Sequence, residues 1–251
     1  MTVPPADLIL AAFLIFCRIG ACLMVMPGFG SARLPMKTRL FIALGVTLAL
    51  TPPLVDIVLP LAAGADPARV VVLIVTESLV GLKIGTIARL FYMALQTMTH
   101  AIANFIGFGG MPGAPVEDTE SLPPVTTLVT MTATALLFIT DLHWEVFRGL
   151  VASYTVMPPA LSYQTRLSLV EITDRIGEAF ILSLRIASPF LIFGVVANLA
   201  LGLINKLAQQ IPIYFVSMPL MLGAGLFGLY FLVGEFLGLF HAGFAAWLTG
   251  R

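Results

Sequence analysis

The sequence predicts an all-α, polytopic membrane protein made of helical hairpins, with about six apolar segments, that forms one subunit of a larger helical assembly. Of its 251 residues, 59% are hydrophobic and only 10% are charged, whereas about 25% are charged in an ordinary soluble domain. The mean hydropathy of +1.02 leaves too little polar surface to face water on all sides. No stretch alternates apolar and polar residues over the length typical of a membrane β-barrel, so helices must satisfy the backbone groups.

The apolar segments follow one another along the chain with few interruptions. A helix needs about 20 apolar residues to cross a bilayer. We expect runs at 8–32, 40–55, 70–106, 122–140, 179–204 and from 211 to the C-terminus. The second run is expected to end at Pro52, Pro53 and Asp56. The charged stretch 141–178 is typical of a solvent-facing, partly amphipathic helix.

The ends of these segments suggest how the chain is organised. The first residues lack the basic region of a cleavable signal peptide, so we expect the first run to be retained. The basic residues of 33–39 and Lys206 would both face the cytoplasm if the N-terminus starts outside. No linker divides the sequence, and we predict one domain over 1–251.

Charged residues within the apolar segments point to an assembly. They are Arg18, Glu77, Lys83, Arg89, Arg185 and Glu235. Each would cost about 2.5–3.5 kcal/mol if it faced lipid. The three on the third run are spaced six residues apart, which does not form i,i+4 pairs on one helix face. We therefore expect these side chains to contact other protein or water. Snorkelling to the membrane interface is the alternative for any single residue.

Small residues predict close packing between helices. Gly81 and Gly85 are four residues apart, as are Gly234 and Gly238. This spacing lets two helix backbones approach closely in a membrane, although it names no partner. Cys17 and Cys22 diverge by about 140° on a helix, so we expect two buried free thiols rather than a disulfide or a metal site.

A stretch rich in glycine and proline separates the third and fourth runs. Its candidate pore or plug residues are Gly107, Phe108, Gly109, Gly110, Met111, Pro112 and Gly113. Such a composition excludes a helix, and non-helical backbone at membrane depth requires surrounding protein or a water-filled cavity. Phe108 and Met111 would supply deformable apolar tips for a seal. An ordinary surface loop on the cytoplasmic side is the alternative, and the residues alone favour it.

Catalytic and cofactor motifs are missing from the sequence. His100, His143 and His241 are scattered, and there is no HExxH, CxxC, P-loop or Gly-x-Ser-x-Gly pattern. Asp141 and His143 diverge by about 200° on a helix. We expect no enzyme activity, no cofactor and no metal, and the zero net charge argues against nucleic acid as a partner. A small-solute transporter or channel is the main alternative, although no inverted repeat is recognisable.

Several blocks, in a fixed order over nearly the whole chain, resemble a known family. They are 18–27, Leu34-Pro35 with Arg39, Thr51-Pro52-Pro53-Leu54, ESLVGLKIG at 77–85, Leu136-Leu-Phe-Ile139 with His143, NLALGLINK at 198–206, Gln209-Gln210 and Pro219-Leu220. Together they resemble the flagellar biosynthesis protein FliR family and, more distantly, its counterparts in virulence type III secretion. The family's Gln-x-Gly and Asp-Pro elements are absent near residue 106, and Gln209-Gln210 stands where Pro-Gln is usual.

This resemblance implies a structural subunit of the flagellar type III protein export gate. FliP-like and FliQ-like subunits, and an FlhB-like subunit, are the implied partners, and unfolded flagellar axial proteins are the implied substrates. The implied location is the flagellar basal body in the bacterial inner membrane, in contact with lipid, with the hairpins stacked in an assembly raised from the bilayer plane. The resemblance also implies that the loop after the third segment helps to plug the closed pore, and that no cofactor is needed.

Overall fold

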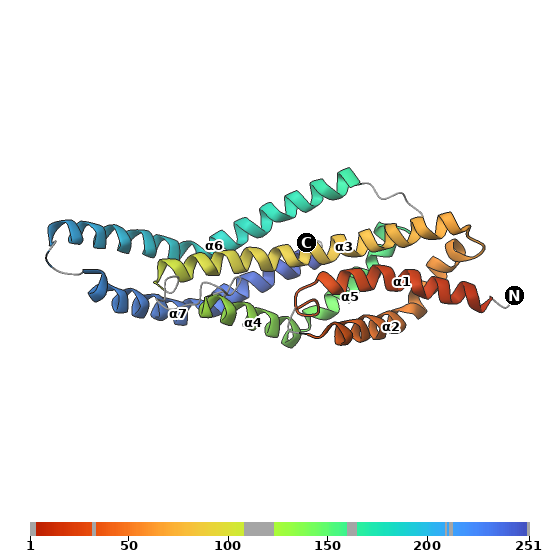
Figure 1. The fold of residues 1–251 in the computed structure, drawn as a ribbon, viewed down its shortest axis with the longest axis horizontal. Coiled ribbons are helices and arrows are strands. Elements are labelled where there is room, and N and C mark those ends of the chain that lie inside the picture. Colours follow the sequence, from red (N-terminus) through yellow and green to blue (C-terminus); the bar gives the residue numbers. More distant parts are fainter. Residues whose placement is uncertain are drawn as a thin grey trace. The chain divides into compact units, whose positions relative to one another are not determined.

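A computed structural model describes residues 4–31, 34–107, 123–159, 165–208, 210 and 213–249. The chain is 89% helical, and no strand occurs in the described ranges, which confirms the all-α prediction. Figure 1 shows the helices in chain order. They are α1 (Pro5–Val25), α2 (Met36–Ala62), α3 (Pro67–Phe105), α4 (Pro124–Ile139), α5 (Leu142–Val156), α6 (Thr165–Leu207) and α7 (Ile213–Thr249).

Two helix boundaries differ from the sequence-based expectation. Helix α2 continues through Pro52, Pro53 and Pro60 instead of ending near residue 55. Prolines are tolerated in apolar helices that neighbouring helices surround, and α2 is in contact with α1 and α5. Helix α6 joins the end of the charged stretch to the fifth apolar run without a break.

The first of two compact units comprises Met1–Phe91, Thr140–Ile176 and Trp247–Arg251. Within it α1 packs on α2, and α2 also contacts α5. Ala11, Ile15 and Ile19 lie on the buried face of α1. This spacing of four residues places them on one side of a helix. Cys17 and Cys22 are free and buried, as expected.

The second unit comprises Tyr92–Ile139 and Gly177–Ala246. Its part of α6 runs antiparallel to α7 as a helical hairpin (Figure 1). The Tyr92 ring is perpendicular to the rings of Phe240 and Phe244, with centroids 5.2 and 5.9 Å away. The Tyr92 hydroxyl donates to the carbonyl of Ala133 on α4, 3.2 Å away. The end of α3, the hairpin and α4 therefore share an aromatic core.

Within the described ranges, five helices are long and apolar enough to cross a membrane, or six spans occur if α4 and α5 count as one broken span. This number agrees with the expected six apolar segments. Helix α3 has 39 residues and is roughly 58 Å long at 1.5 Å per residue. Since a bilayer core is about 30 Å thick, part of α3 lies beyond what one span requires.

Candidate functional site: a buried charge cluster

The site begins with a close crossing of α1 and α3. A side chain at Gly81 would overlap the backbone carbonyl of Arg18, and the Cβ of an alanine at Gly85 would lie 2.6 Å from the carbonyl oxygen of Cys22. Only glycine allows the two backbones to come this near. Gly81 and Gly85 therefore form a helix contact within the chain. This contact holds Arg18 of α1 against α3, and Gly81 lies about one turn after Glu77.

Arg18 and Glu77 form a buried bidentate ion pair. Arg18 Nε lies 2.7 Å from Glu77 Oε2, and Arg18 Nη2 lies 2.8 Å from Oε1. The exposed fractions of the two side chains are 0% and 1%. Two parallel charge-assisted hydrogen bonds match the planar guanidinium to the carboxylate. Such a pair offsets much of the cost of removing both charges from water.

Helix α5 completes the surroundings of the guanidinium. Arg18 Nη1 donates to Ser153 Oγ and Arg18 Nη2 donates to the Met157 carbonyl, each at 3.0 Å. The Tyr154 ring lies flat against the group, with its centroid 3.9 Å from Arg18 Cζ, within the range of a cation–π contact. Every nitrogen of the guanidinium therefore has an acceptor. The cluster fastens three helices of the first unit together.

A second ion pair adjoins the first. Lys83 lies six residues after Glu77 on α3, and its Nζ lies 2.5 Å from Glu171 Oε2 on α6. The Lys83 side chain is buried, whereas Glu171 is about half exposed. Lys83 Nζ also contacts Met157 Sδ at 3.8 Å. Met157 thus touches both cations, through its carbonyl and its thioether.

The other predicted residues lie elsewhere. Arg89, Arg185 and Glu235 are exposed on the chain by itself, so their expected contacts with other protein or with water stay a prediction. Gly107 follows the end of α3 with a φ of 90°, which favours glycine. The remaining candidate plug residues, Phe108 to Gly113, lie outside the described residues.

Four members of the cluster were not predicted from the sequence, namely Ser153, Tyr154, Met157 and Glu171. The first three lie on or just after a helix that the charge pattern marked as solvent-facing, and α5 instead buries Ser153 and Tyr154. A usable signal was the presence of unpaired charges on two apolar helices, because buried charges need partners.

The arrangement is structural rather than catalytic. Arg18 and Glu77 are buried and bonded to each other, so neither side chain is open to a substrate. Across the described parts of the chain, no group of three or more His, Cys, Asp or Glu residues is placed to hold a metal ion. The cluster can fix helices, and its closed geometry gives a reacting molecule no access.

Comparisons with known proteins show which proteins the chain is similar to. Residues 9–247 match the family described as bacterial export proteins, family 1. The chain is 31% identical to the flagellar biosynthetic protein FliR of Caulobacter vibrioides, over 86% of this chain and 85% of that protein. It is 22% identical to FliR of Escherichia coli, over 83% and 78% of the two proteins. It is also 28% identical to the secretion system apparatus protein SsaT of Salmonella typhimurium, over 70% of each.

Proposed function

Because the chain belongs to the bacterial export proteins, family 1, we propose that it is a structural subunit of the flagellar type III protein export gate. The observation that carries the proposal is the 31% identity to a flagellar biosynthetic protein FliR over 86% of the chain. The similarity to SsaT supports a role in type III secretion more broadly. Family membership also points away from an enzyme, in line with the buried ion pair of Arg18 and Glu77.

The proposal extends to partners and location. FliP-like and FliQ-like subunits, with an FlhB-like subunit, form the gate with this chain, and unfolded flagellar axial proteins pass through it. The gate lies in the inner membrane at the flagellar basal body. Five apolar helices support a membrane location, and the exposed charges Arg89, Arg185 and Glu235 support contacts beyond this chain.

Deleting the gene tests the function directly. We expect the deletion strain to lose export of flagellar axial proteins and to regain it when the wild-type gene is supplied in trans. The measurement is the amount of axial protein in the culture medium, with a Sec-dependent secreted protein as the control. Axial proteins that reach the medium at the wild-type level in the deletion strain would contradict the proposal.

The stretch 107–113 is proposed to seal the closed gate. The support is local: α3 ends at Phe105, Gly107 has a φ that favours glycine, and bulky apolar residues follow. Phenylalanine and methionine can fill a narrow passage without fixed geometry. Deleting 108–112, or replacing it by glycine and serine at the same length, should therefore increase leakage of small solutes while the gate still assembles.

The two variants separate sealing from chain length. Leakage is measured as uptake of a small impermeant solute by cells that contain the assembled gate. Increased leakage in both variants supports a plug formed by the side chains. If both variants assemble and stay as tight as wild type, the stretch is a surface connector and the proposed plug is wrong.

A further inference from the structure

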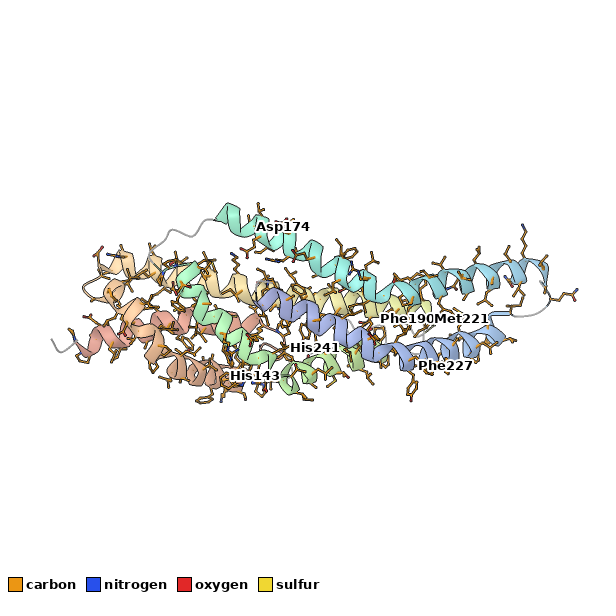
Figure 2. The ribbon with its side chains drawn as sticks, turned by 180° about the vertical axis from the view of Figure 1, so that it is seen from behind. His143, Asp174, Phe190, Met221, Phe227 and His241 are labelled. Atoms are coloured by element: carbon orange, nitrogen blue, oxygen red, sulfur yellow. The ribbon has the colours of Figure 1, made fainter. Side chains whose placement is uncertain are left out.

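The outer face of α7 differs from its inner face. Phe236, Phe240 and Phe244 are buried in the second unit. At 100° per residue, the opposite side of the helix carries Phe227, Phe231, Gly234 and Gly238. Phe227 extends away from the hairpin (Figure 2) and is 67% exposed. A Cβ at Gly234 or Gly238 would meet nothing within 4 Å.

One carboxylate stands beside this glycine pair. Glu235 is the only Asp, Glu, Lys or Arg in 213–249, and it is exposed. Among the described residues it has neither an ion pair nor a hydrogen bond from its side chain. Arg185 on α6 is exposed and lies about 200° around that helix from the buried Ser183, so it faces away from the core.

Lipid does not stabilise the Glu235 carboxylate. Glu235 lies about 33 Å from the start of α7 and about 21 Å from its end, at 1.5 Å per residue. The short side chain cannot carry its charge past several apolar turns to reach water, as a lysine or arginine can. A carboxylate at such a position in an apolar helix therefore needs a cation close by.

We propose that the face formed by Phe231, Gly234, Glu235 and Gly238 binds an apolar helix of a neighbouring gate subunit that carries a lysine or arginine level with Glu235. The glycines allow that helix to approach closely, as Gly81 and Gly85 do inside this chain. Close approach brings the two charges together and keeps water away from them, and both strengthen the ion pair. The inference rests on the proposed function, because it assigns a residue of this chain to contact with the proposed partner subunits.

The test compares variants in the co-expressed gate complex. The chain is affinity-tagged and purified with the FliP-like and FliQ-like subunits. Glu235→Gln keeps the shape of the side chain and removes its charge. Gly234→Leu places a bulky side chain where a partner helix would approach. We expect each to lower the yield of complex by more than about tenfold, because one variant leaves a buried cation without its partner and the other prevents close approach. Asp174→Asn and Gly177→Leu are the matched controls, because both positions are exposed on α6 and a Cβ at Gly177 meets nothing (Figure 2 labels Asp174). Both controls should leave the yield unchanged.

A second measurement identifies the molecule that contacts this face of α7. A photo-crosslinking residue at Phe231 should give a product with a FliP-like or FliQ-like subunit, and Glu235→Lys should be rescued by reversing one basic residue on the crosslinked helix. Crosslinks only to lipid, or to a second copy of this chain, overturn the proposal. So does rescue of Glu235→Lys by Arg185→Glu within the same chain, which would reveal an internal ion pair.

Failure of the inference is distinguishable from failure of the proposed function. If wild-type chain copurifies with the partner subunits and Glu235→Gln copurifies equally well, only the role of Glu235 is wrong. If wild-type chain does not copurify with them at all, the gate assignment itself is wrong. The thermal unfolding of the chain alone should be unchanged by Glu235→Gln, because the Glu235 side chain has no hydrogen bond or ion pair with the described part of the chain.

Discussion

The first helices of the chain and its last hairpin use the same sequence features in opposite ways. On α1 and α3, Arg18, Glu77 and Lys83 are buried and paired. The backbone of α1 lies directly against Gly81 and Gly85. On α7, Glu235 is exposed and Gly234 and Gly238 face open space. Correspondingly, 44% of the most apolar stretch of α1 is buried within the chain, against 11% for α7. A charge beside a glycine pair therefore marks a helix contact, but it does not say whether the contact lies within the chain or with a partner.

The largest expected effect comes from breaking the internal ion pair. Arg18→Met leaves the Glu77 carboxylate buried without its partner, which typically costs about 3–5 kcal/mol. The double variant Arg18→Met with Glu77→Leu removes both charges and should recover most of that loss, because apolar groups of similar volume often replace a buried pair at little cost. Thermal unfolding of the detergent-purified gate complex measures both changes.

The charge on α7 provides the contrast for that experiment. Glu235→Gln should not change the unfolding of the chain alone, whereas Arg18→Met should destabilise the chain with or without partners. If Arg18→Met unfolds at the wild-type temperature, the pair contributes no net stability and the distinction between the two regions fails.

Glycine substitutions should give the next largest effect, with opposite signs in the two regions. Gly81→Ala forces a Cβ against the Arg18 carbonyl, so α1 and α3 must separate, at about 1–3 kcal/mol. Gly234→Ala has open space and should stabilise the chain alone by about 0.5–1 kcal/mol, because alanine loses less backbone entropy in a helix. The unfolding midpoints of the chain in detergent test the sign. Equal effects at the two glycines would contradict the assigned contacts.

The sequence predicted the helical class and the number of apolar segments, because hydropathy measures what a bilayer selects. It did not predict the course of α2 through Pro52, Pro53 and Pro60, since proline rules describe helices in water better than helices whose neighbours satisfy the backbone. The charged stretch 141–178 predicts a helix separate from the fifth apolar run, but α6 continues from one into the other.

The candidate site was predicted only in part. Arg18, Glu77 and Lys83 were named individually, but their pairing was not, because Arg18 and Glu77 are 59 residues apart on different helices. Spacing rules detect neighbours on one helix and cannot match residues between helices. The proximity of Gly81 and Gly85 to both Glu77 and Lys83 was the available clue, since a close helix crossing brings one more helix to those charges.

The smallest expected effect concerns the outer ion pair of the first unit. Glu171→Gln removes the carboxylate that meets Lys83, but Glu171 is 46% exposed, so water already screens the pair. The expected loss is under about 1 kcal/mol, and it should shrink further when the salt concentration is raised, because exposed charges are screened by ions. The long apolar stem of Lys83 lets its ammonium group move toward water once the partner is gone, which Arg18, enclosed by α5, cannot do. Unfolding midpoints of Glu171→Gln in low and high salt, beside Asp174→Asn as an exposed control on the same helix, test this. A loss as large as that of Arg18→Met, unchanged by salt, would show that Lys83 and Glu171 belong to the buried core and that exposure does not separate the two pairs.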